Sequence, residues 1–114
     1  MPKRDAVRVR HMLEAAREAV ELVKGKSQQD LEYERLLHLS IVRLLEVVGE
    51  AARRVSPDAQ RRHDRVAWPK IIGMRNHLIH GYDVVDFDVV WRVLTVDLPH
   101  LIPELEAILS SEEP

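Results

Sequence analysis

Apolar residues recur along most of the chain at alternating spacings of four and three, which is the period of an amphipathic helix. The first run with this pattern comprises Val9, Leu13, Ala16, Val20 and Val23. Gly25 follows it, and Ser27 with Asp30 three residues later has the pattern of a capped helix start. The pattern predicts one helix that stops at Gly25 and a second that begins shortly after it.

The second predicted helix, residues 29–55, is longer and more apolar than the first. Its main stripe comprises Leu37, Ile41, Leu44, Val48, Ala51 and Val55, and further apolar residues broaden it. A stripe of this width suggests contacts on more than one side, with the bundle core and with a partner. Gly49 within it costs a helix about 1 kcal/mol relative to alanine. We therefore expect another helix to approach closely at Gly49.

Later segments also carry helix start signals. Ser56 and Pro57 predict a short third helix. A fourth is expected from Trp68 through His80, where Gly81 ends it. Asp86 is expected to cap a last helix, residues 87–109, which two prolines should kink or divide near residue 98.

No strand-like alternation persists, and the only candidate, YDVVDFDVV, is short and interrupted by acids. The chain is thus expected to be an all-α, single-domain antiparallel bundle of about five helices. Residues 1–110 should form this domain, and residues 111–114 a flexible tail.

Composition narrows the class of protein. The chain has 114 residues, of which 46% are hydrophobic and 32% charged, as in one soluble domain with a core. It has no cysteine, which excludes disulfides and thiolate metal sites. Because no apolar run reaches a membrane-spanning length and the charged start lacks a signal segment, we expect a cytoplasmic protein.

The net charge of −2 is unevenly distributed. Residues 83–114 contain eight acids and one base, for a net charge of −7, whereas residues 1–82 carry +5. A basic half can attract phosphates, although a solvated connecting region has the same composition.

The stretch GMRNHLIHGY, residues 73–82, gathers Arg75, Asn76, His77, His80 and Tyr82. Arginine binds phosphate oxygens through two parallel hydrogen bonds, and histidine exchanges protons near neutral pH. On a continuous helix Asn76 and His80, four residues apart, would share a face, whereas Arg75 would point about 140° away from His80. Two copies meeting across a two-fold axis could bring all three residue types into one cleft.

Such a set suits metal-free RNA cleavage, in which the ribose 2′-hydroxyl attacks its own phosphate. The same residues are also typical of a structural helix end, and spacing alone favours that interpretation. His77 and His80 could suggest a metal pair, but no third ligand has suitable spacing.

Arg75, His80 and Tyr82 match the R-x4-H-x-Y motif of HEPN-domain toxins, the HepT-like ribonucleases of HEPN/MNT toxin–antitoxin pairs, and Asn76 matches the polar residue after the arginine. The likeness extends over residues 46–56 and 66–91 and over the DLP at 97–99. The chain thus resembles this family over most of its length.

This resemblance implies a homodimeric helical bundle that cleaves RNA without a metal or cofactor at a composite site in the dimer cleft. It implies Arg75 and His80 as catalytic residues and Asn76 as a supporting polar group. The partner would be a minimal nucleotidyltransferase antitoxin that transfers AMP from ATP onto Tyr82. His77 stands where the family varies and is assigned no catalytic role. The alternative is a non-catalytic HEPN module that binds a nucleotidyltransferase.

Overall fold

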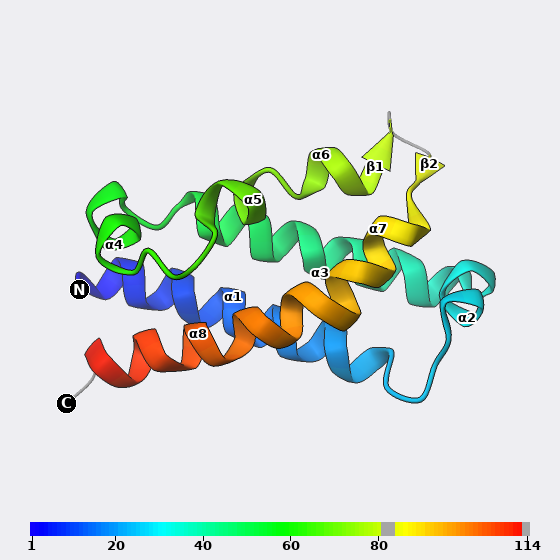
Figure 1. The fold of residues 1–114 in the computed structure, drawn as a ribbon, viewed down its shortest axis with the longest axis horizontal. Helices are drawn as coiled ribbons and strands as arrows, with labels where there is room; N and C mark the ends of the chain where they lie inside the picture. Colours follow the sequence, from blue (N-terminus) through cyan, green and yellow to red (C-terminus); the bar gives the residue numbers. More distant parts are fainter. Residues whose placement is uncertain (81–83, 113–114) are drawn as a thin grey trace.

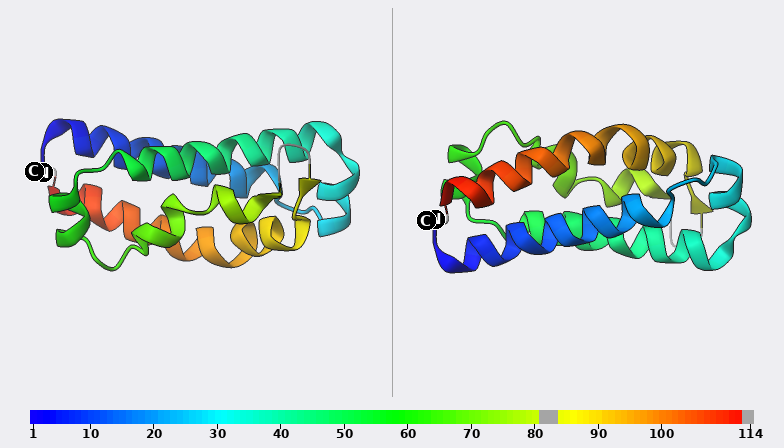
Figure 2. Two further views of the ribbon diagram at one scale, coloured as in Figure 1. Left: turned by 90° about the horizontal axis from the view of Figure 1, so that it is seen from above. Right: turned by 90° about the horizontal axis from the view of Figure 1, so that it is seen from below.

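Three helices form the frame of the molecule: α1 (Lys3–Leu22), α3 (Arg35–Arg53) and α8 (Leu98–Glu112). The computed structural model describes residues 1–80 and 84–112. Both α3 and α8 run antiparallel to α1, in a bundle of 44 × 29 × 19 Å (Figure 1). The expected all-α, single-domain bundle is confirmed. The start of α1 and the end of α8 lie at the same end of the molecule in all three views (Figures 1 and 2).

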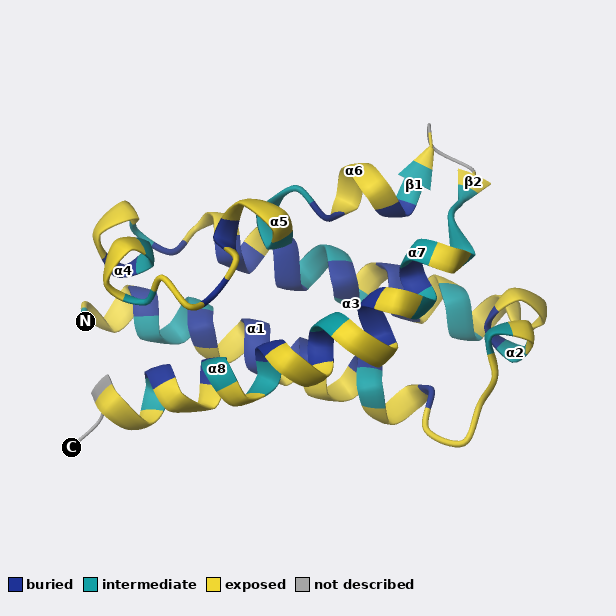
Figure 3. Cartoon of the chain, viewed as in Figure 1, coloured by how far each residue is buried: buried dark blue, intermediate teal, exposed yellow. Residues whose placement is uncertain are grey.

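The core lies where the apolar stripes of these helices meet. The stripe predicted for the first helix is buried except for Val20, which is partly buried. Met12, Ile41 and Leu45 are fully buried, and buried positions line the inward sides of the ribbon in Figure 3. Each such side chain contributes roughly 1.5–3 kcal/mol of stability, so helix packing dominates the stability of this fold.

The second predicted helix is divided. The capping box of Ser27 and Asp30 starts α2 (Gln28–Tyr33), as expected. Glu34 then has an extended backbone, with ψ 95°, and α3 begins after it, so the prediction of one continuous helix over 29–55 is wrong. His38 of α3 spans the break, because its Nδ1 lies 3.1 Å from the Leu31 carbonyl oxygen.

The short helix α4 (Pro57–Arg62) begins at the predicted Ser56 cap, whose hydroxyl accepts a hydrogen bond from the Ala59 amide. Asp5 of α1 is buried beneath it. Its two carboxylate oxygens accept hydrogen bonds from the Ser56 amide, at 2.9 Å, and from the Ser56 hydroxyl, at 2.6 Å. This buried carboxylate is therefore satisfied and ties α4 to α1.

The next helix, α5 (Trp68–Ile72), crosses α3 at Gly49. A Cβ atom on Gly49 would lie 3.1 Å from the Ile71 carbonyl oxygen. The expected close approach at this glycine is confirmed. Because residues 73–80 follow α5 directly, this contact fixes where along α3 that segment begins.

The last predicted helix is divided into α7 (Phe87–Arg92), a π-helical turn η1 (Val93–Asp97) and α8. The predicted division near residue 98 is confirmed. Pro99 has no N–H for the Thr95 carbonyl, so the regular hydrogen-bond ladder cannot continue there. The end of α8 at Glu112 lies two residues inside the segment expected to be a tail. No helix in the described part of the chain is long and apolar enough to cross a membrane.

Candidate active site

The segment that carries the sequence motif is not one helix. A single turn, α6 (Arg75–Leu78), follows α5, and the chain then becomes extended at Ile79, with φ −129° and ψ 127°. Strand β1 (Ile79–His80) pairs antiparallel with β2 (Val84–Val85), with His80 opposite Val84. The prediction of a helix through His80 is therefore wrong, and so is the shared helix face of Asn76 and His80. The expectation that no strand forms is also wrong, although each strand has only two residues.

Local interactions explain why the helix ends early. Ile79 is β-branched and prefers extended backbone. The Leu78 carbonyl, which a longer helix would use internally, accepts a hydrogen bond at 2.8 Å from the Asp86 amide. Leu78 itself is fully buried and anchors the turn to the core. The motif histidine consequently projects from a small hairpin rather than from a helix.

Asp86 connects this hairpin to α7. One of its carboxylate oxygens, Oδ1, accepts the capping hydrogen bond from the Val89 amide at 3.1 Å. The other, Oδ2, lies 3.4 Å from His80 Nε2. The Val89 amide first, and His80 second, hold the pKa of Asp86 below its usual value. Asp86 therefore presents a carboxylate to His80, which favours the tautomer with hydrogen on Nε2.

Arg75 lies beside α3. Its Nε is 3.8 Å from Glu46 Oε2, and 65% of its side chain is exposed. An exposed ion pair of this length stabilises a protein little. The guanidinium can thus exchange the carboxylate for a phosphate at small cost.

The structure places the described predicted residues, Arg75, Asn76 and His80, on neighbouring elements, and no hydrogen bond or ion pair joins them to one another. Arg75, Asn76 and His80 are all exposed on α6 and β1, which lie in the half of the molecule away from the start of α1 (Figures 1 and 3). Tyr82 lies outside the described residues. His77, also exposed on α6, lines a cavity.

Sequence reasoning identified Asp86 only as a helix cap and gave Glu46 no role. The six-residue separation of His80 and Asp86 across Gly81 was the available signal, because short apolar pairs on either side of a glycine indicate a hairpin. Within the described residues, no group of three His, Asp or Glu side chains is arranged to hold a metal ion.

Residues 12–108 match the family described as Ribonuclease HepT-like. The chain belongs to this family. It is 31% identical over 100 residues to a protein of Thermococcus cleftensis named "Probable ribonuclease HepT", covering 84% of this chain and 91% of that protein. It is 33% identical over 103 residues to a "Putative RNase" of Caldanaerobacter subterraneus subsp. tengcongensis, covering 90% of this chain and 92% of that protein.

A third relative, from Methanocaldococcus jannaschii, is named "Gamma-glutamylcyclotransferase and putative RNase". The identity is 28% over 109 residues, which cover 96% of this chain and 49% of that longer protein. No solved structure matches the chain. Membership of the HepT-like family supports a ribonuclease function.

Proposed function

We propose that this HepT-like protein is a metal-independent RNA endonuclease in which Arg75 and His80 are the catalytic residues and Asn76 supports them. The observation that carries the proposal is the arrangement of His80. Its side chain is 62% exposed, yet one ring nitrogen faces a carboxylate that also caps a helix. An accessible histidine with a defined tautomer is what a general base requires.

The reaction has two proton transfers. The 2′-oxygen forms a bond to phosphorus as its proton passes to Nδ1 of one His80. The bond from phosphorus to the 5′-oxygen breaks, and that oxygen takes a proton from a second, protonated histidine. Arg75 neutralises the phosphate oxygens, and Asn76 donates a hydrogen bond to one of them. The products are a 2′,3′-cyclic phosphate and a 5′-hydroxyl.

A homodimer supplies the second histidine. The exposed side of α3 carries Leu36 and Leu39, which are 82% and 48% exposed. Leu39 and Glu46 are seven residues apart and share one side of α3, and Glu46 pairs with Arg75. A two-fold contact along this side would cover the leucines and bring two copies of Arg75 and His80 together. Acid and base would then be the same residue from different chains.

The family resemblance further supports a toxin of a toxin–antitoxin pair. A minimal nucleotidyltransferase antitoxin would transfer AMP from ATP to the hydroxyl of Tyr82, releasing pyrophosphate. Tyr82 follows His80 by two residues in the sequence. The bulky anionic adduct would repel RNA phosphate and obstruct its entry beside His80.

Cleavage of a labelled RNA in EDTA tests the proposal. Wild-type protein should cleave, whereas His80→Ala and Arg75→Ala should lose cleavage and keep their helical circular dichroism. His11→Ala, which removes an exposed histidine from α1, is the matched control and should cleave normally. End analysis should detect the cyclic phosphate.

Mass spectrometry of the same sample first verifies that Tyr82 carries no AMP. Unmodified dimeric protein that leaves RNA intact would refute the nuclease and favour the nucleotidyltransferase-binding module. Cleavage that persists in His80→Ala would refute the assigned residues.

A further inference from the structure

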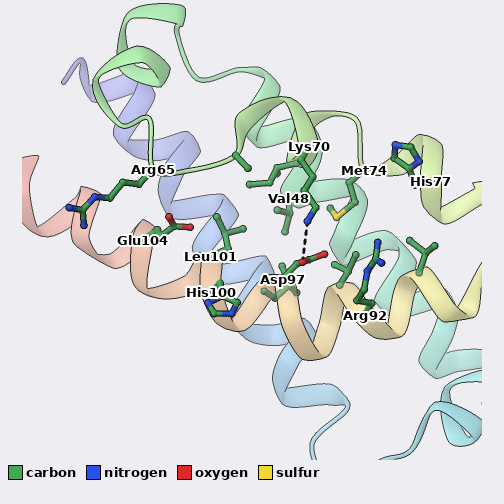
Figure 4. Close-up of a pocket in the computed structure, with 15 residues that line it drawn as sticks. Val48, Arg65, Lys70, Met74, His77, Arg92, Asp97, His100, Leu101 and Glu104 are labelled. Atoms are coloured by element: carbon green, nitrogen blue, oxygen red, sulfur yellow. Dashed lines mark hydrogen bonds and ion pairs between the residues drawn. The ribbon is translucent and has the colours of Figure 1, made fainter.

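A cavity of about 310 Å³ lies between α5, α6 and the consecutive elements α7, η1 and α8 (Figure 4). It is distinct from the Arg75–Glu46 pair, because neither residue lines it. Its size is at the lower end of the range for small-molecule sites, about 300–1,000 Å³.

The cavity has an apolar wall and a cationic rim. Val48, Ile71 and Met74 contribute to the wall, from α3, α5 and the residue before α6. His77 and Arg92 stand at one end of the cavity in Figure 4. A flat apolar group fits the wall, and an anion fits the rim.

At the end of the cavity next to α6, two basic side chains of the lining, His77 and Arg92, are without an ion-pair partner among the described residues. Lys70 Nζ lies 3.2 Å from Asp97 Oδ1, so these two lining charges offset each other. Among the described residues, the side chains of His77 and Arg92 make no hydrogen bond or ion pair. The remaining acid of the lining, Glu104, is at the opposite end of the cavity, near Arg65 (Figure 4). The end next to α6 therefore favours an anion.

We propose that this cavity is a nucleotide subsite for the RNA strand, with a base against the apolar wall and its phosphate on Arg92 and His77. The inference rests on the proposed nuclease function and assigns its substrate contacts beyond the cleaved bond. Single-stranded nucleic acids are bound by such combinations of cationic groups and base-packing surfaces. The arginine fork adds two hydrogen bonds to one phosphate.

The single turn α6 carries both a cavity residue, His77, and a candidate catalytic residue, Arg75. His77 follows Arg75 by two residues, so the two side chains leave this turn about 200° apart. Arg75 faces α3, whereas His77 faces the cavity. A strand that passes over this single turn contacts both sides of it. The nucleotide in the cavity is thus a neighbour of the cleaved phosphate in the same RNA.

Binding rather than cleavage tests the subsite. Fluorescence anisotropy with a labelled short single-stranded RNA, in EDTA, is measured in a His80→Ala parent so that the RNA stays intact. The pocket variant adds His77→Ala and Arg92→Ala. The matched control adds His11→Ala and Arg4→Ala, which remove the same residue types from exposed positions of α1. If the double pocket variant folds poorly, Arg92→Gln alone replaces it in the binding measurement, because glutamine keeps most of the side chain's length.

The pocket variant should bind the RNA about tenfold more weakly, a difference of about 1.4 kcal/mol. The slope of log affinity against log salt should fall by about 0.7 for the lost phosphate contact. The control should bind like the parent. An RNA that lacks the base at the cavity position should bind the parent more weakly than intact RNA does. The pocket variant should bind the two RNAs equally.

Equal affinity of the pocket variant and the control would overturn the subsite and leave the nuclease proposal standing. A parent that binds no RNA would overturn both. Competition by free AMP that equals competition by the RNA would show a mononucleotide site and would overturn the strand assignment.

Discussion

His80 Nε2 lies 3.4 Å from the carboxylate of Asp86, and the same carboxylate caps α7 through the Val89 amide. One side chain thus fixes both a helix start and the orientation of an exposed histidine. Because the two oxygens divide these tasks, the two functions can be separated by substitution.

Asp86→Asn should separate them. An asparagine oxygen caps a helix as well as aspartate does, so stability should change little, whereas Asp86→Ala should cost about 0.5–2 kcal/mol. With its oxygen on the Val89 amide, the introduced side-chain amide would turn an NH₂ group toward His80 and reverse the favoured tautomer. RNA cleavage should then fall about 10²-fold, the lower end of a general acid–base contribution.

Single-turnover cleavage and urea unfolding of both variants measure the two effects. Nitrogen-15 NMR of His80 reports the tautomer directly. Full activity in Asp86→Asn would show that the carboxylate acts only as a cap.

The lowered pKa of Asp86 predicts an acid-dependent stability. Because its pKa is lower in the folded than in the unfolded chain, the ionised form favours folding. This contribution should be complete above the unfolded value of about 3.9 and should disappear as pH falls through the lower folded-state pKa.

Urea unfolding of wild type and Asp86→Asn between about pH 3 and pH 6 isolates the effect. Asp30 and Glu50, whose pKa values are also lowered, are present in both proteins and cancel. A stability difference that stays constant down to about pH 3 would contradict the prediction.

Gly49→Ala should destabilise the protein. Alanine gains about 1 kcal/mol of helix propensity, but overpacking costs about 1–3 kcal/mol, and the atom it meets is the backbone oxygen of Ile71. The net loss should be about 1 kcal/mol. Cleavage should fall too, since displacement of α5 moves the chain leading to Arg75.

Gly25→Ala is the control, because Gly25 has φ +77° with no neighbouring atom within 4 Å. It should lose stability through backbone strain and keep its cleavage rate. If Gly49→Ala were more stable than wild type, α5 would have moved away from the added methyl group without loss of stability.

Leu36→Glu combined with Leu39→Glu should break the proposed dimer. Charges buried without partners at the two-fold contact oppose association. Sedimentation equilibrium should show a dimer for wild type and a monomer for the variant, which should also lose RNA cleavage. Leu22→Glu alters an exposed leucine at the end of α1 and should remain dimeric. Dimers of unchanged affinity in the double variant would place the contact elsewhere.

Local signals were sufficient for the helical frame. The caps at Ser27, Ser56 and Asp86 each act within three residues, so short sequence patterns contain them. The core stripe of α1 follows from the helical period alone. Gly49 was recognisable because glycine destabilises a helix, and a close helix contact explains its presence there.

Tertiary interactions account for what the sequence pattern missed. A two-residue strand has no periodicity, and the turn that ends at Leu78 depends on the Asp86 amide. The break at Glu34 lies among charged residues with no glycine or proline to mark it, so the sequence favours a continuous helix there. Arg75 and His80 were identified from their chemistry, but their separate supports, Glu46 and Asp86, come from different elements and could not be predicted by spacing on one helix.

The beginning of α1 and the end of α8 share one end of a bundle 44 Å long, whereas α6 and the paired strands β1 and β2 lie in the other half, towards α2 (Figure 1). A reporter, surface tether or second enzyme can therefore be attached at either chain end without shielding Arg75 and His80. For immobilised or fused versions of this domain, attachment at either chain end is therefore expected to leave RNA access to the proposed site unchanged.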